Sequence, residues 1–306
     1  HEGVVAESGS FMMMDDNITM DTIFGDGSGQ SKDILGSLFS AGKRLLTGES
    51  LFMTVFTNAS GQKRKISFAS PYPGKIIPVH LTDFNGEFIC QKDAFLCAAK
   101  GVSISIEFSK KIGRGLFGGE GFIMQKVQGD GLAFLHASGT VVKRELKAGE
   151  MLRVDTGCLV GFSRTVDYDI EFVGGIRNTI FGGEGFIMQK VQGDGLAFLH
   201  ASGTVVKREL KAGEMLRVDT GCLVGFSRTV DYDIEFVGGI RNTIFGGEGM
   251  FFATLRGPGT VAIQSLPFSR LANRVLAYAP KSGGKSRGEG SILGGLGDLL
   301  DGDNRF

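Results

Sequence analysis

The sequence predicts an all-β protein of tandem β-sandwich or jelly-roll lobes in a pseudo-symmetric closed arrangement, with one short amphipathic helix. Three observations predict this fold class. Glycine accounts for 49 of the 306 residues, about twice its usual share of ~7%, whereas proline is limited to 6. Short runs alternate apolar with polar residues, and turn residues separate these runs. A block of 64 residues occurs twice without a single change.

The duplicated block defines the expected domain organisation. Residues 117–180 and 181–244 are identical, and the FGGEG that opens each copy recurs at Phe245. Residues 48–116 are a diverged cousin, because GEFICQKDAFLCAA there parallels GEMLRVDTGCLVGF in the first copy. Repeats of this length indicate stacked or ring-like units. We therefore expect each copy to be one lobe, with FGGEG as the hinge where lobes begin. Such identity is typical of a recent duplication, an engineered insertion or an assembly error, and the sequence does not choose among them.

The two ends of the chain match the two halves of such a lobe. EGVVAESGSFMMM, from Glu2, aligns with the second half, and FGGEGMFFATLRGPGTVAIQSLP, from Phe245, aligns with the first half. We expect the ends to complete one lobe and close the arrangement. The predicted order is 1–30, second half of the terminal lobe; 31–47, amphipathic helix; 48–116, first lobe; 117–180, second lobe; 181–244, its identical copy; 245–280, first half of the terminal lobe; and 281–306, a Gly-rich tail.

Within one copy the pattern is that of short strands. Residues 166–173, VDYDIEFV, alternate with period two, which predicts a half-buried strand with an acidic solvated face. Residues 122–127, 131–137 and 140–146 are also strand-like. Tight turns between them are expected at the pairs Asp130-Gly131, Ser138-Gly139, Ala148-Gly149 and Thr156-Gly157.

One segment breaks the strand pattern. Ser31 to Leu46 carries apolar residues at helical spacing, which predicts an amphipathic helix. We expect this helix to pack on the β core or on a partner subunit. Docking on a membrane surface is the sharper alternative, and it would use Ile34, Leu35, Leu38 and Phe39.

Composition narrows the functional classes. Lysine plus arginine equals aspartate plus glutamate, at 33 each, so the chain has no global field that attracts nucleic acid. No signal peptide is visible and no apolar run approaches the ~20 residues of a membrane span. We expect a cytoplasmic protein, with peripheral membrane contact as an addition. The cysteines have no metal-type spacing and are expected to be buried thiols: Cys90, Cys97, Cys158 and Cys222.

No catalytic, cofactor-binding or metal-binding residues are predicted, and no cofactor is expected. The chain lacks a nucleophile elbow, and none of its four histidines belongs to a metal-binding spacing. His136, whose copy is His200, lies in a predicted strand and is expected to be a hydrogen-bonded structural residue. Glu150 and Asp155 flank turns, so capping explains them more simply than acid–base chemistry.

A combination of motifs carries a family resemblance. ESGSFMMMDDNITMDT, AGKRLLTGESLFMTVFTN, LKAGEMLRVDTGCLVGF, VDYDIEF and GEGSILGGLGDLLDGD together resemble the bacterial relatives of altered inheritance of mitochondria protein 24, a mitochondrial biogenesis family. The resemblance covers nearly all of the chain. It implies three lobes with a fold like that of the tryptophan RNA-binding attenuator, and no established enzymatic activity. The family's mitochondrial member is linked to inner-membrane organisation.

The chain departs from that family by having two identical middle lobes instead of one. Because the insertion joins like to like at FGGEG, we expect both copies to fold alike, with strain or exposure at the surfaces between lobes. The function we expect is that of a non-enzymatic scaffold or assembly protein acting through protein contacts, self-association included. The alternative is a binding module for a small ligand or RNA held between lobes.

Overall fold

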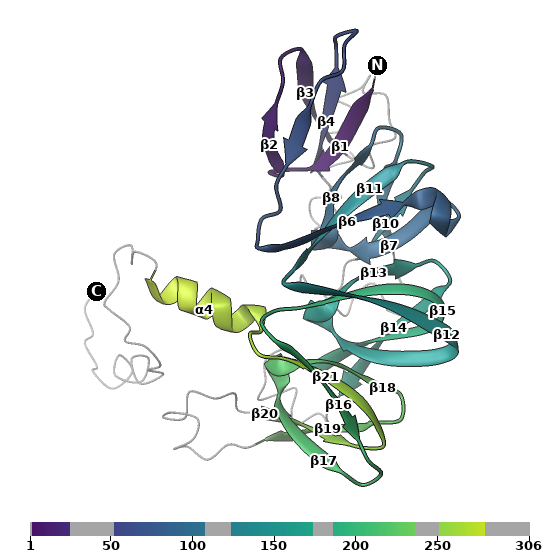
Figure 1. Cartoon of the computed structure of the whole chain (residues 1–306), viewed down its shortest axis with the longest axis vertical. Helices are drawn as coiled ribbons and strands as arrows, with labels where there is room; N and C mark the ends of the chain where they lie inside the picture. The colour runs from purple at the N-terminus through teal and green to yellow at the C-terminus, as the bar shows by residue number, and fades with distance from the viewer. Residues whose placement is uncertain (1, 25–51, 108–123, 174–185, 237–250, 279–306) are drawn as a thin grey trace, which may run out of the picture. The chain divides into compact units, whose positions relative to one another are not determined.

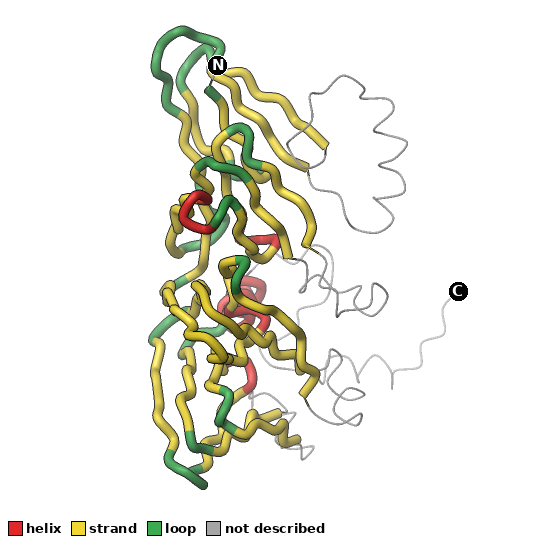
Figure 2. The backbone as a smooth tube through the Cα atoms, turned by 90° about the vertical axis from the view of Figure 1, so that its right-hand side faces the viewer, coloured by secondary structure: helices red, strands yellow, loops and turns green. Residues whose placement is uncertain are grey.

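The computed structural model describes residues 2–24, 52–107, 124–173, 186–236 and 251–278, and strands dominate them (Figures 1 and 2). The strands are β1(Gly3–Glu7), β2(Phe11–Met14), β3(Ile18–Phe24), β4(Phe52–Asn58), β5(Ile66–Phe68), β6(Gly74–His80), β7(Glu87–Gln91), β8(Phe95–Ala99), β9(Ser103–Glu107), β10(Met124–Gln128), β11(Leu132–Ser138), β12(Thr140–Asp155), β13(Leu159–Ser163), β14(Val166–Val173), β15(Phe186–Ala201), β16(Val205–Leu210), β17(Met215–Asp219), β18(Leu223–Ser227), β19(Asp231–Phe236), β20(Phe251–Arg256) and β21(Gly259–Gln264). Short 3-10 turns occur at Leu81–Phe84, Lys92–Ala94, Thr156–Cys158 and Thr220–Cys222, and the α-helix of the described residues is α4(Phe268–Tyr278). The predicted all-β class is confirmed.

The chain divides into two compact units. Unit 1 comprises 1–170 and 189–201, and unit 2 comprises 171–188 and 202–306. In unit 1 a six-stranded sheet has the order β3-β4-β1-β8-β11-β6, and β2 pairs with β5 alongside it. Also in unit 1, β10 lies between β7 and β9, while β13 lies between β7 and β15. In unit 2, β21 lies between β16 and β18, and β20 lies between β17 and β19.

One strand pairing recurs four times with the same register. In unit 1, Leu159 pairs with Leu199 and then, after a bulge, Gly161 pairs with Phe198. In unit 2, Leu223 pairs with Ile263 and, after the same bulge, Gly225 pairs with Ala262. The pairs β8–β11 and β2–β5 carry the bulge at the equivalent place. A bulge conserved in register marks a specified feature of a sheet, so these four pairs are equivalent parts of a repeated structure.

The recurrent pairings group the strands into four modules. We define module 1 as β1–β5, module 2 as β6–β11, module 3 as β12–β15 and module 4 as β16–β21. The sequence copies that begin at Phe117 and Phe181 start between β9 and β10 and between β14 and β15, which is inside modules 2 and 3. The FGGEG segments therefore lie inside modules 2 and 3 and not at a module border, because the strands on either side of FGGEG pair with each other.

Each end of the chain pairs with strands that are near it in sequence. Strands β1 to β3, expected in a terminal lobe with 245–280, pair with β4, β5 and β8 of unit 1. Strands β20 and β21 pair with β16 to β19 of unit 2. Each end of the chain thus already has strand partners from its own neighbourhood in sequence. The predicted closed arrangement of lobes stays a prediction.

The predicted strands inside a copy are confirmed, and the predicted helix is not the one described. Residues 166–173 form β14, and residues 122–127, 131–137 and 140–146 overlap β10, β11 and β12. The predicted helix at 31–46, with its membrane-docking alternative, lies outside the described residues. Instead α4 occupies part of 245–280, which we expected to be the first half of the terminal lobe, and its apolar side chains recur at 268, 271, 275 and 278.

Each unit has its own apolar core. In unit 1 the largest cluster contains fully buried Phe88, Phe95 and Leu135. A second cluster in unit 1 gathers around Phe56 and Leu96. In unit 2 the core contains Leu223, Leu255 and other buried aliphatic residues. These cores fix the strands that carry the polar groups described next.

Candidate functional site

In modules 2, 3 and 4 a polar residue directly follows the bulged strand pairing described above. His136, His200 and Gln264 follow Leu135, Leu199 and Ile263, which are equivalent by register. His136 is 1% exposed and Gln264 is 8% exposed. Buried polar side chains are costly unless they are hydrogen-bonded, so the partners of each one show its role.

His200 acts as a structural link. Its Nδ1 accepts a hydrogen bond of 3.0 Å from the backbone N–H of Ser138, the last residue of module 2, and lies 2.8 Å from the Ser138 hydroxyl. It also forms a hydrogen bond with the backbone of Gly157. Burial is the main cause that lowers the pKa of His200, so the neutral ring is favoured at neutral pH. The prediction of a hydrogen-bonded structural histidine is confirmed for this copy.

Gln264 makes the equivalent bonds with an amide. Its Oε1 accepts from the backbone N–H of Ser202 at 2.9 Å, and its Nε2 donates to the carbonyl of Gly221 at 3.3 Å. Ser202 and Gly221 are the copies of Ser138 and Gly157. A side chain with one acceptor and one donor at this spacing therefore ties the end of one module to the next.

His136 has neither of these partners, although its strand has the same sequence as that of His200. Both ring nitrogens of His136 lack a hydrogen-bond partner. Counted from the β2–β5 register, the residue equivalent to Ser138 is Pro71, and proline has no N–H to donate. The carbonyl equivalent to that of Gly157 is Asp93 O, which accepts from the Tyr72 hydroxyl at 3.4 Å. The predicted hydrogen bonding of His136 is therefore wrong for this copy.

The carboxylate of Glu7 and the phenol of Tyr72 lie next to His136. Glu7 Oε2 lies 3.7 Å from His136 Nε2, and the Glu7 side chain is 35% exposed. The Tyr72 ring lies edge-on to the imidazole, with ring centroids 5.0 Å apart. His136 thus joins the end of β11 to the end of β1 through a pair of titratable groups.

The other titratable groups of this cluster keep their protons at neutral pH. Burial, followed by the charges of Asp93 and Glu7, raises the pKa of Tyr72 to about 12. Burial, followed by Glu7, raises the pKa of the Cys90 thiol. A thiol that is not ionised is a poor nucleophile, so the cluster offers a carboxylate–imidazole pair without an activated nucleophile.

The acidic residues at the turns have the capping role that we predicted. The Asp155 carboxylate accepts from Gly157 N–H at 3.0 Å. Glu150 contacts the Arg144 guanidinium and accepts from the Lys147 N–H. The second copy repeats both arrangements with Asp219 and Glu214. These carboxylates serve the turns of both copies.

A second feature is an exposed apolar strand in unit 1. Strand β2 is exposed along its whole length, whereas the equivalent strands β8, β13 and β18 are almost entirely buried. The exposed large side chains of this surface are Phe11 at 42%, Met12 at 60%, Met13 at 59% and Met14 at 40%, with Met20 of β3 at 55%. We call these five residues the methionine surface.

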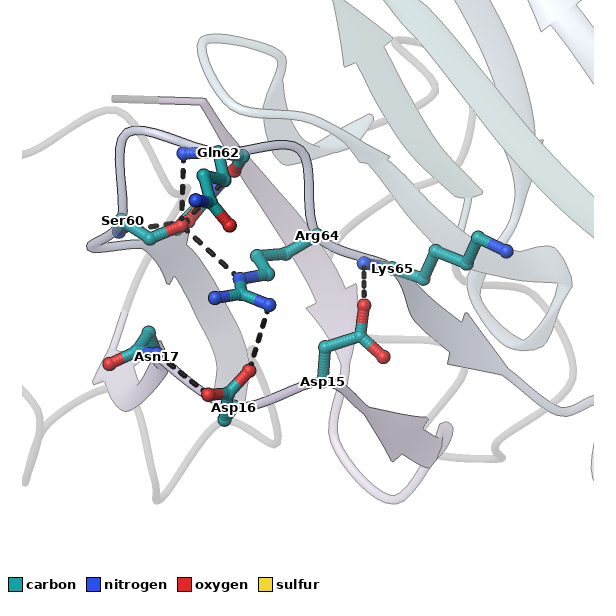
Figure 3. A network of polar contacts seen from close by, with 8 residues as sticks. Asp15, Asp16, Asn17, Ser60, Gln62, Arg64 and Lys65 are labelled. Carbon is teal, nitrogen blue, oxygen red and sulfur yellow. Dashed lines mark hydrogen bonds and ion pairs between the residues drawn. The ribbon is translucent and has the colours of Figure 1, made fainter.

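Polar contacts fix the turn beside the methionine surface (Figure 3). The Lys65 N–H donates to the Asp15 carboxylate at 2.7 Å, and the Asp15 N–H donates to the Lys65 carbonyl at 2.9 Å. Arg64 forms an ion pair with Asp16 at 3.0 Å and donates to Ser60 at 3.4 Å. The polar insert that lengthens 48–116 therefore holds the β2–β3 turn in place and gives the methionine surface a charged border.

The prediction of buried cysteines is confirmed for Cys90, Cys97 and Cys158, whereas Cys222 is half-buried, and none of these four forms a disulfide. Across the described ranges, no group of three or more histidine, cysteine and acidic residues could hold a metal ion. The described residues also contain no helix of the length and apolarity that a membrane crossing needs.

Neither feature of this site was predicted from the sequence. His136 and His200 lie in identical stretches of sequence, but their partners come from other segments. The difference is visible in the sequence only after Pro71 is aligned with Ser138, and that needs the strand register. The consecutive methionines were visible, but their exposure depends on which strand lies beside β2.

The fold and the site define the class first: this is an all-β repeat protein whose modules are joined strand to strand and tied by buried polar side chains. The family follows from direct comparison. The family model of mitochondrial biogenesis AIM24 matches residues 1–187 and again residues 174–266. The chain belongs to this family, as the sequence resemblance implied.

Two proteins of Streptococcus pyogenes are similar to the chain. An uncharacterized protein of serotype M6 is 31% identical over 188 residues, which cover 60% of this chain and 71% of the relative. The crystal structure of protein SPYM3_0169 from the same species covers 91% of this chain and 90% of its own, at 21% identity and a TM-score of 0.44.

Proposed function

We propose that this protein is a non-enzymatic scaffold that acts through protein–protein contacts, with the methionine surface as a principal contact. The observation that carries the proposal is the exposure of β2, whose equivalents in the other modules are buried. A contiguous exposed apolar patch with a polar border is typical of interaction sites. Methionine side chains adapt to irregular partner surfaces.

The preorganised turn supports the same proposal. Asp15, Asp16, Arg64 and Lys65 hold the border of the surface before any partner arrives. A surface that is already ordered loses less conformational entropy when it binds. The carboxylate–imidazole pair at Glu7 and His136 has no ionised thiol beside it, which favours a structural role over a catalytic one. Binding of a small ligand or RNA between lobes stays a prediction.

A site-specific photo-crosslinker tests the scaffold function. It replaces Met12 in the full chain in cells, with the same probe at the exposed Lys207 of β16 as the matched control. We expect Met12 to yield a reproducible covalent adduct with a discrete protein at several times the yield of the control. Equal yields at both positions would contradict the contact surface. Turnover of a screened substrate by the purified chain would contradict the non-enzymatic part.

A further inference from the structure

Modules within unit 1 are joined by one repeated edge-to-edge pairing. Strand β8 pairs antiparallel with β1 of the preceding module, with Ala6 opposite Cys97. Strand β13 pairs antiparallel with β7 of its preceding module, with Cys90 opposite Gly161. The next pairs are Val5 with Ala98 and Ile89 with Phe162. The junction therefore has a fixed register.

The first module offers one half of this junction. β2 is the equivalent of β8 and β13, because it pairs with β5 as they pair with β11 and β15. Among the described residues, β2 has β5 as its sheet partner and no strand at its other edge. Met13 and Met14 stand where Cys97 and Ala98 are buried in module 2, but they are 59% and 40% exposed.

The last module offers the other half. β17 is the equivalent of β1 and β7, because it pairs with β20 as they pair with β4 and β10. It is the outer strand of the sheet β17-β20-β19, and no strand is described at its other edge. By register, Val218 corresponds to Cys90 and Arg217 corresponds to Ile89.

We infer that β17 of one molecule pairs antiparallel with β2 of a second copy of this chain, with Val218 opposite Met13 and Arg217 opposite Met14. The inference rests on the proposed scaffold function and names the partner of the methionine surface. Free sheet edges recruit further strands, and these two edges match a junction that the chain itself already uses. Because the two halves are at different places in the chain, the contact is heterologous and joins copies head to tail.

Mixing two cysteine variants tests the inference. One population of the full chain carries Arg217→Cys and the other carries Met14→Cys, so a disulfide between them can form only between copies. Directly opposed residues of an antiparallel pair have Cα atoms about 4.5–5.5 Å apart, which suits a disulfide. Both positions are exposed, and the ion pair of Arg217 with Glu235 is on the surface, so neither change disturbs a core.

We expect the mixture, under mild oxidation, to give at least ten times more mixed disulfide dimer than Met14→Cys mixed with Lys207→Cys. We also expect sedimentation velocity of the unmodified chain to show mass that rises with concentration, and Met14→Lys, which faces Arg217, to weaken this association at least tenfold. A mixed-dimer yield equal to that of the control overturns the inference. If the Met12 probe then still captures a different protein, the scaffold function stands without self-association; if it captures nothing, both fail.

Discussion

At the scale of the residue, neighbours decide what a histidine does. His136 and His200 lie in identical stretches of sequence, and His136 is buried whereas His200 is half-buried. His200 receives an N–H from Ser138, whereas the corresponding residue for His136 is a proline. One histidine therefore ties two modules together, and the other is left beside the Glu7 carboxylate.

The same substitution at both histidines should separate these roles. His200→Leu leaves the Ser138 N–H without its acceptor, and we expect it to lower the free energy of unfolding by about 1–3 kcal/mol. His136→Leu removes a ring without hydrogen bonds, so we expect a change near zero or a gain in stability. Urea unfolding of the two variants measures both values. Equal losses at the two positions would show that the hydrogen bonds of His200 do not matter.

The lowered pKa of His200 gives a pH dependence with a defined sign. Its folded-state pKa lies below the ordinary value of 6.5, mainly because the ring is buried. The unfolded chain therefore binds a proton that the folded chain excludes as pH falls through about 6.5, and stability contributed by the neutral ring is lost there. His200→Gln keeps one donor and one acceptor, as Gln264 does, and cannot titrate. Between pH 7.5 and pH 5, we expect this variant to lose less free energy of unfolding than the wild type. A parallel decline of both proteins would exclude His200 as the source.

At the scale of the element, local pattern predicted strands well and their surroundings poorly. Alternation at 166–173 predicted β14 with the bounds that the structure gives, because a strand's periodicity is a property of its own residues. The exposure of β2 is not such a property. FMMM is as apolar as the buried LVGFS of β13, and it is exposed because no described strand lies beside it as β7 lies beside β13.

The same limit explains why α4 was missed. Residues 245–280 were predicted to be the first half of a lobe because they begin with FGGEG, and the alignment with the other repeats holds through β21. Beyond it, apolar residues at 268, 271, 275 and 278 follow the spacing of a helix, and Arg270 contacts Asp219 at 3.3 Å. The spacing of these apolar residues is that of a helix, but the alignment with the repeat indicated that the segment continues the lobe.

At the scale of the whole molecule, the chain is a series of modules whose borders cut across the sequence repeat. The pairs β8–β11, β13–β15 and β18–β21 have equivalent registers, so the expectation that both copies fold alike is confirmed for these pairings. It is wrong for the strand bounds, because residues 140–155 form the single strand β12 whereas the same sequence at 204–219 forms the two strands β16 and β17. Nothing in either copy alone could reveal the borders, because strand partners come from the two sides of each FGGEG.

Removal of one period should therefore be tolerated. Deletion of residues 140–203 joins Gly139 to Thr204, which recreates the natural Gly139–Thr140 junction. We expect a folded protein whose urea m-value is about a quarter lower, since m scales with the surface exposed on unfolding and one of four modules is gone. Circular dichroism during urea unfolding measures both the fold and the m-value.

A half-period deletion is the control for this experiment. Removing residues 140–171 leaves β15 without the strands β12, β13 and β14 that pair with it, so we expect loss of cooperative unfolding. If both deletions fold equally well, the module is not the unit of stability in this chain.

The matching of the inserted length to the structural period has a consequence for how this protein can change. A gain or loss of 64 residues within the duplicated region produces the same junctions wherever the break occurs, because the sequence on both sides of any break is repeated. Chain length can therefore change in whole steps without a single new loop, new cap or new buried contact having to arise. The protein can therefore be lengthened or shortened by one 64-residue period at a time.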